Sequence, residues 1–167
     1  ELGFVVVVKM LIGAGACVTA KTACGETALY LGCQQGHGDV VRLLLDAGAG
    51  VNGVQGRDGG TPLAAAVANG NSAVVAILTS AGADMTARDA NGQTALSTAC
   101  LSRHGLGVVR VLLDAGADVN GAQGRDGWTA LHCAAALGSV DVVKMLIDAG
   151  ADMTAQDADE KTALSMG

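Results

Sequence analysis

The chain has 167 residues, with 16 acidic against 10 basic side chains and a formal net charge of −6. Half of its residues are apolar, which excludes an intrinsically disordered chain, because disorder needs few hydrophobic residues and much net charge. The acidic balance argues against nucleic acid or an anionic membrane as a partner. With one Phe, one Tyr and one Trp, the core must be built from Leu, Val, Ile and Ala.

The five cysteines are an odd number at irregular spacings: Cys17, Cys24, Cys33, Cys100 and Cys133. Small secreted proteins that depend on disulfides are shorter and denser in cysteine. We therefore expect reduced thiols and a cytoplasmic or nuclear location. No apolar run approaches the ~18 residues that a membrane-spanning helix needs, so we expect a soluble protein without membrane insertion.

Two short patterns recur along the whole chain at intervals of 33 to 35 residues. Ala-Gly-Ala has its Gly at 15, 48, 82, 116 and 150, and Thr-x-Leu begins at 27, 61, 94, 129 and 162. Self-similarity at such a period is typical of stacked repeat proteins. The spacing gives four complete units, with part of a unit at each end.

Each unit predicts two short helices followed by a polar connection. The Thr is placed to cap a first helix, and Pro62 falls at a first helical position, where its missing N–H does no harm. Gly36, Gly70 and Gly138 are placed to end the first helix in a left-handed conformation. A second helix such as residues 40–45 then ends at Ala-Gly. An aspartate recurs once per repeat in the connecting loops, where Asp side chains bond to nearby backbone amides: Asp58, Asp89, Asp126 and Asp157.

Several segments resemble the ankyrin repeat, among them Gly59-Gly-Thr-Pro-Leu63, Gly127-Trp-Thr-Ala-Leu-His132 and Asp114-Ala-Gly-Ala-Asp-Val-Asn120. The resemblance implies an all-α fold, an ankyrin-repeat solenoid of helix-turn-helix pairs with hairpin-like loops. Residues 1–12 resemble the second helix of a truncated repeat, with Gly3 at the helix-ending place. We expect a single array over residues 1–167, with partial repeats at 1–22 and 158–167 and full repeats at about 23–56, 57–89, 90–124 and 125–157.

The sequence departs from the family pattern in three ways. The third unit carries one extra residue near Leu101-Ser-Arg-His104, which should bulge the turn between its helices. The usual His after Thr-Pro-Leu is present only as His132, and Tyr30, Ala64 and Ser97 replace it in other units. The resemblance implies that this His hydrogen-bonds to neighbouring backbone. The last repeat has Glu160 where the turn Gly belongs.

The sequence contains only weak matches to the motifs of nucleotide-binding and metal-binding sites. Residues 48–53 match the dinucleotide pattern G-x-G-x-x-G, but a strand must precede that loop, and here a helix is expected. Cys33 with His37, and Cys100 with His104, could each be half of a metal site, yet both cysteines fall at small core positions. We predict no catalytic residues, no metal, no cofactor and no small-molecule substrate, and hence no enzymatic activity.

The candidates for partner binding are exposed positions that vary between units. The residue before each Thr varies most, and Trp128 is either an interface anchor or a ring lying across the neighbouring repeat. The Arg residues of the loops and variable residues of the first helices complete the set. The candidates are Trp128, Tyr30, Gln93, Glu26, Lys161, Arg57, Arg88, Arg125, Gln34 and Asn69.

The sequence as a whole predicts a protein–protein interaction module. It would bind an unidentified partner, or another part of its own parent chain, through hairpin tips and the concave inner-helix surface. One alternative is a structural spacer or assembly component whose ends or Ala-rich faces stack on other subunits. Another is a regulatory part of a larger enzyme or channel.

Overall fold

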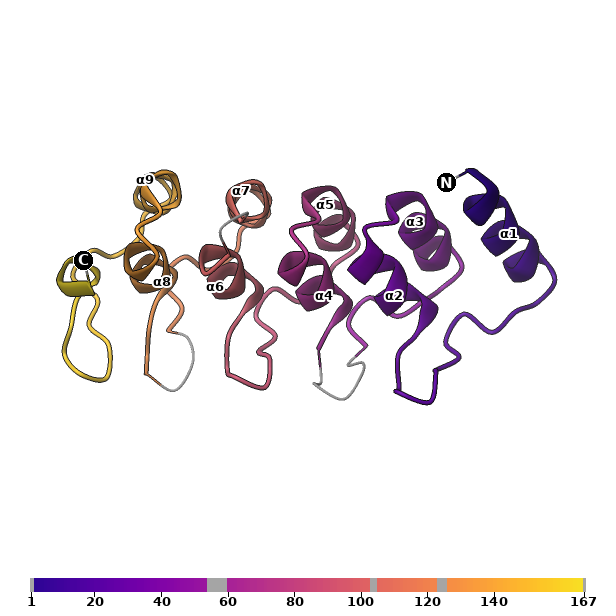
Figure 1. The fold of residues 1–167 in the computed structure, drawn as a ribbon, viewed down its shortest axis with the longest axis horizontal. Coiled ribbons are helices and arrows are strands. Elements are labelled where there is room, and N and C mark those ends of the chain that lie inside the picture. The colour runs from indigo at the N-terminus through magenta and orange to yellow at the C-terminus, as the bar shows by residue number, and fades with distance from the viewer. Residues whose placement is uncertain (1, 54–59, 103–104, 123–125, 167) are drawn as a thin grey trace. The chain divides into compact units, whose positions relative to one another are not determined.

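The computed structural model describes residues 2–53, 60–102, 105–122 and 126–166 (Figure 1). The chain divides into two compact units, Glu1–Asp84 and Met85–Gly167. The described part of the first unit contains α1 (Leu2–Gly13), α2 (Ala28–Gln35), α3 (Gly38–Asp46), α4 (Pro62–Ala68) and α5 (Ser72–Ser80). That of the second contains α6 (Ala95–Cys100), α7 (Leu106–Asp114), α8 (Ala130–Ala136), α9 (Val140–Asp148) and the 3-10 helix η1 (Ala163–Met166).

In the first unit the helices form two layers. The first helices of the repeats, α2 and α4, pack side by side, and the second helices α1, α3 and α5 form the other layer (Figure 1). Each first helix also packs on the second helix of its own repeat, α2 on α3 and α4 on α5. At seven to nine residues, helices α2 to α5 are shorter than the ~12–15 residues at which isolated helices become marginal. Their stability therefore depends on packing.

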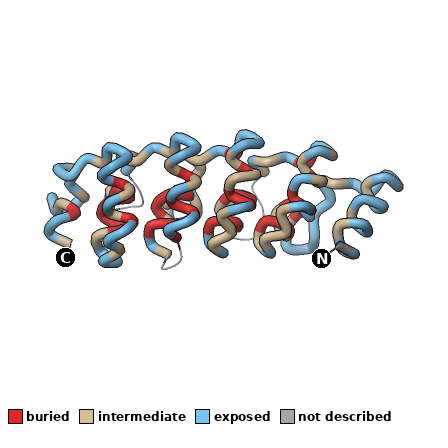
Figure 2. The backbone as a smooth tube through the Cα atoms, turned by 90° about the horizontal axis from the view of Figure 1, so that it is seen from above, coloured by how far each residue is buried: buried red, intermediate tan, exposed pale blue. Residues whose placement is uncertain are grey.

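The second unit repeats this arrangement. Helix α6 packs on α7 and α8, α8 packs on α9 and η1, and α7 packs on α9. In both units the buried stretches fall on the helices (Figure 2). The largest fully buried side chains are mostly leucines and valines, such as Leu63, Leu78, Leu96 and Leu112. The expected aliphatic core is confirmed.

The predicted threonine caps are confirmed. The hydroxyls of Thr27 and Thr61 accept hydrogen bonds from the backbone N–H groups of Tyr30 and Ala64, at 3.3 and 3.1 Å. Thr94 and Thr129 form capping boxes, in which the side chain three residues later bonds back to the cap backbone. Pro62 is the first residue of α4, as expected.

The predicted glycine ends of the first helices are also confirmed. Gly36, Gly70 and Gly138 have φ angles of 76°, 69° and 67°, in the left-handed region that favours glycine. The third first helix, α6, ends differently, because its C-cap Leu101 is followed by Ser102 and not by a left-handed glycine, and one extra residue precedes α7. The residues of that turn at 103 and 104, including His104, lie outside the described part.

The N-terminal second helix is confirmed, but the prediction that Gly3 lies beyond a helix end is wrong. Helix α1 begins at Leu2, so Gly3 lies inside it. A Cβ at Gly3 would meet no atom within 4 Å, so no close approach requires glycine there. The pattern placed this glycine by analogy with Gly36, whose conformation depends on a preceding helix.

Glu160 is strained as the sequence suggests. Its φ is +61°, the only positive φ among the described non-glycine residues, and it takes the loop place that Gly25 and Gly92 hold in other repeats. A left-handed conformation costs a non-glycine residue about 1–2 kcal/mol. A glycine avoids this cost, but its greater conformational entropy in the unfolded state offsets part of the gain. We expect Glu160→Gly to raise the free energy of unfolding by about 1 kcal/mol in urea denaturation. The converse variant Gly92→Glu should lower it, and a stability loss in Glu160→Gly would contradict this account.

Candidate protein-binding surface

Three hairpin tips are closed by the same hydrogen bonds. The backbone N–H of Thr22, Asp89 and Asp157 donates to the carbonyl four residues later, at 2.8 to 2.9 Å. The side-chain oxygen of the same residue accepts a bond from the N–H of that later residue, at 3.2 Å for Thr22 and 2.9 Å for the two aspartates. The expected turn role is therefore confirmed for Asp89 and Asp157; that of Asp126 stays a prediction, and Asp58 lies outside the described residues.

Hydrogen bonds from nearby backbone amides also lower the pKa values of two loop carboxyls, those of Asp157 and Asp152. The N–H of Lys161, followed by that of Asp159, holds the pKa of the exposed Asp157 carboxyl below its ordinary value. The hydroxyl and the N–H of Thr154 lower the pKa of Asp152 in the same way. Both carboxylates therefore stay ionised at neutral pH as acceptors for backbone donors.

The residues four positions after these tip residues stand directly before the helix-capping threonines. Glu26, Gln93 and Lys161 thus share one backbone geometry but carry acidic, amide and basic side chains. Glu26 and Gln93 are half-buried, whereas Lys161 is exposed and lies 3.4 Å from Asp159. An exposed ion pair of this kind contributes about 0–1 kcal/mol. Trp128, at the same position of another repeat, is half-buried.

Within the first unit, a candidate from a first helix lies next to one of these positions. The Tyr30 ring and hydroxyl lie against Gly60, which precedes the capping threonine of the next repeat. Gln34 is half-buried, and the exposed Asn69 donates its amide to the Ala65 carbonyl at 3.0 Å. A first-helix side chain can therefore contact the variable position of the following repeat.

The side chain of Arg88 forms hydrogen bonds to the backbone of two loops. Its guanidinium donates to the carbonyls of Gly92, at 2.9 Å, and Ala122, at 2.7 Å. Ala122 belongs to the loop of the next repeat, so Arg88 joins two successive loops. Charge-assisted bonds of this length are stronger than neutral ones. The equivalent candidates Arg57 and Arg125 lie outside the described residues.

Two asparagines make matching bridges that the sequence analysis missed. The Asn52 amide donates to the Gly82 carbonyl at 3.2 Å and accepts from the Asp84 N–H at 2.8 Å. Asn120 makes the same pair of bonds to residues 150 and 152, at 3.1 and 2.8 Å. The recurrence of Asn at an interval of 68 residues was the available signal.

The expected role of His132 is confirmed. Its ring is fully buried, and Nδ1 accepts from the Thr129 N–H at 3.2 Å. With Nδ1 as an acceptor, Nε2 carries the proton and donates to the Lys161 carbonyl at 3.0 Å. The side chain therefore joins the cap of α8 to the variable position of the next repeat.

Comparison with known families agrees with the repeated helix pairs. A family model described as ankyrin repeats (three copies) matches residues 2–89 and 82–157. The chain belongs to the ankyrin-repeat family. No curated protein matches the chain in sequence.

The cysteines of the first helices are core residues of the ankyrin repeats, as predicted. Cys33, Cys100 and Cys133 are buried, and desolvation raises their thiol pKa values to about 12, 12 and 11. These thiols stay protonated at neutral pH and are poor nucleophiles or metal ligands. Among the described residues, no group of three or more His, Cys, Asp or Glu side chains could hold a metal ion.

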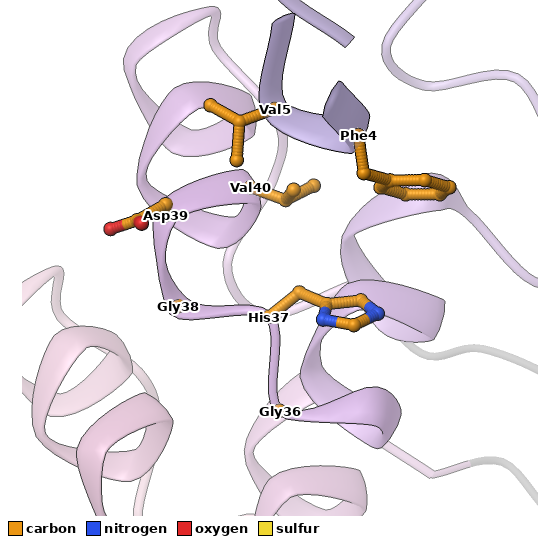
Figure 3. Close-up of a pocket in the computed structure, with 7 residues that line it drawn as sticks. All are labelled: Phe4, Val5, Gly36, His37, Gly38, Asp39 and Val40. Atoms are coloured by element: carbon orange, nitrogen blue, oxygen red, sulfur yellow. The ribbon is translucent and has the colours of Figure 1, made fainter. Parts of the chain in front are cut away.

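The described ankyrin repeats of the first unit offer small hollows. One, of about 120 Å³, lies where α1 meets the turn between α2 and α3, with the Phe4 and His37 rings 5.7 Å apart (Figure 3). Its volume is below the ~300–1,000 Å³ of typical ligand pockets. The glycine pattern at 48–53 follows α3 rather than a strand, which the dinucleotide motif requires. In the described residues, no helix has the length and hydropathy to cross a bilayer.

Proposed function

We propose that this chain is a protein-interaction module that binds a partner protein through its hairpin tips and first helices. Ankyrin repeats generally serve as such modules. The observation that carries the proposal is a set of equivalent positions, each directly before the capping threonine of its repeat. There the same backbone hydrogen bonds hold Glu26, Gln93 and Lys161, whose side chains differ in charge and size.

The mechanism is rigid presentation of varied side chains. The tip bonds and the bridges from Asn52, Arg88 and Asn120 order the loops before any partner arrives. Binding then loses little conformational entropy in the loops, which favours affinity for a given contact area. Specificity would come from the variable side chains and not from the repeat framework.

The proposed contacts are assigned to each unit separately. In the second unit they are Gln93, Trp128 and Lys161, with Trp128 as the aromatic anchor; Arg88 would position its loop. In the first unit they are Glu26, Tyr30, Gln34 and Asn69. Arg57 and Arg125 remain sequence-based candidates.

We propose no catalytic activity and no cofactor for the chain, and a protein rather than nucleic acid as its partner. A cytoplasmic or nuclear location is part of the same proposal. The exposed free thiols of Cys17 and Cys24 support it, since unpaired exposed cysteines suit a reducing compartment.

Trp128→Ala tests the proposed anchor. Once affinity capture from native lysate and mass spectrometry have identified a partner, we expect this variant to bind it about 30-fold more weakly by calorimetry, as hot-spot aromatics do. Val140→Ala, at an exposed site on α9, is the control and should bind like the parent. Unchanged affinity of the Trp128→Ala variant would show that Trp128 is not an anchor. Unchanged affinity in variants of all seven proposed contacts would overturn the proposed surface.

A further inference from the structure

The loops after α3 and α7 share the geometry of their asparagine but differ two residues before it. The side chains of Asn52 and Asn120 each bond to the carbonyl 30 residues later and to the N–H 32 residues later. Two residues before Asn120, the carboxylate of Asp118 accepts a hydrogen bond from the Asn120 N–H at 3.0 Å. The corresponding residue before Asn52 is Gly50, which has no side chain. In the described part of the chain, the Asn52 N–H has no acceptor.

Two other loops also carry a side chain that bonds two residues onward from this place. Asp152 accepts hydrogen bonds from the N–H and the hydroxyl of Thr154, at 2.8 and 2.7 Å. These donors hold the pKa of the Asp152 carboxyl below its ordinary value, so the place stabilises a negative charge. In the first loop the sulfur of Cys17 lies 3.3 Å from the Thr19 hydroxyl. Of the five residues that follow Ala-Gly-Ala, only Gly50 lacks a side chain.

A hollow of about 240 Å³ lies beside Gly50, between the α1–α2 loop and the start of the loop after α3. Its lining includes Gly50 and Gly53 from one loop and Thr19, Lys21 and Thr27 from the other. Lys21 is the only charged residue among the described ones that line it, and its backbone pairs with that of Thr27. A Cβ at Gly50 would meet no atom within 4 Å, so the space next to it is open.

We propose that this hollow binds the carboxylate of an Asp or Glu side chain of the partner protein. The carboxylate would take the place that Asp118 fills in its own loop, accept from the Asn52 N–H and face the Lys21 ammonium. Hydrogen bonds to an ionised acceptor are stronger than neutral ones. The hollow is smaller than the ~300–1,000 Å³ of small-molecule pockets, which suits a single side chain. The inference rests on the proposed function, because it assumes a protein partner.

Acetate, titrated while the amide signals are followed by NMR, tests the site without a partner. Relative to chloride at equal ionic strength, acetate should shift the Asn52 and Gly53 signals and reach saturation. The Asn120 signal should not respond, because Asp118 already accepts from that N–H. A missing acetate response at Asn52, or an equal response at Asn120, would overturn the carboxylate site.

The charge of Lys21 has a matched control. Lys21→Gln should weaken acetate binding about threefold, as expected for loss of an exposed ion pair. Lys9→Gln removes the same charge from an exposed residue of α1 outside the hollow lining and should bind acetate like the parent. Equal effects of the two substitutions would contradict a contact with Lys21.

Gly50→Asp fills the proposed place with a carboxylate of the chain itself. The φ of Gly50 is not in the left-handed region, and a Cβ there has room, so the variant should fold. Its Asn52 signal should no longer respond to acetate. Gly50→Ala adds no acceptor and should keep the response. A response that persists in Gly50→Asp would overturn the proposal.

The same two variants test whether the carboxylate comes from the partner. Gly50→Asp should weaken the affinity for a partner of the proposed surface about tenfold, as loss of a charged hydrogen bond does, and Gly50→Ala should not. Unchanged affinity in Gly50→Asp would overturn the assignment to a partner side chain and leave the site to free carboxylate ions. Failure of the proposed function is a different result, in which variants of all seven proposed contacts keep the parent affinity.

Discussion

Gly36→Ala is expected to lower the free energy of unfolding by about 2–4 kcal/mol, measured by urea denaturation. Two effects add. The φ of 76° costs a residue with a Cβ about 1–2 kcal/mol, and the new Cβ would lie 2.8 Å from the Asn71 side-chain oxygen. Asn71 would have to move away from the carbonyls of Cys33 and Gln34, to which it donates at 3.2 and 3.4 Å.

Gly70→Ala is the matched control, because Gly70 ends the next first helix. Its φ is 69°, but a Cβ there meets no atom within 4 Å. We therefore expect a loss of about 1–2 kcal/mol from backbone strain alone. The double variant Gly36→Ala, Asn71→Ala should relieve the clash, so the two substitutions should not add. Equal losses in Gly36→Ala and Gly70→Ala would show that the Asn71 contact between repeats contributes nothing.

His132→Ala is expected to cost about 2–4 kcal/mol of folding free energy. The substitution removes a fully buried ring, leaves the Thr129 amide without its acceptor, and leaves the Lys161 carbonyl with the Asp157 N–H as its donor. Because Nε2 links α8 to the following loop, the effect should extend to that loop. Hydrogen exchange at the Asp157 and Lys161 amides should become faster.

His132→Ser separates the cap from the link between repeats. Ser97 makes the capping bond in α6, accepting from the Thr94 N–H at 3.1 Å, so a serine can replace the first role of His132. It lacks the ring that extends to Lys161. We expect His132→Ser to recover only the capping part, about 0.5–1.5 kcal/mol, with exchange in the loop still fast. Protection at Asp157 and Lys161 equal to that of the parent would contradict the link.

The repeat unit could be predicted from the sequence because its signals are local. A threonine before an apolar run, a proline at the first helical position and a glycine after about eight residues each satisfy a backbone requirement within one turn. Thr27, Pro62, Gly36 and Gly70 were therefore assigned correctly. Gly3 was misassigned because it was placed by alignment with Gly36, whereas the structure places it inside α1.

The bridges between repeats could not be predicted in the same way. Asn52, Asn71, Asn120 and Arg88 each bond to backbone 30 to 38 residues away. Such bonds depend on how closely successive loops lie in space, and the repeat period alone does not specify this. The 68-residue interval between Asn52 and Asn120 could have indicated a shared role, but not the residues to which they bond.

The central claim is that each helix pair is held by its neighbours and not by its own propensity. Far-UV circular dichroism of an isolated fragment of residues 60–83, which contains α4 and α5, tests it most directly. These short helices lose the neighbouring layers in the fragment, so the account predicts a disordered spectrum without a cooperative thermal transition. A helical spectrum with cooperative unfolding would contradict it.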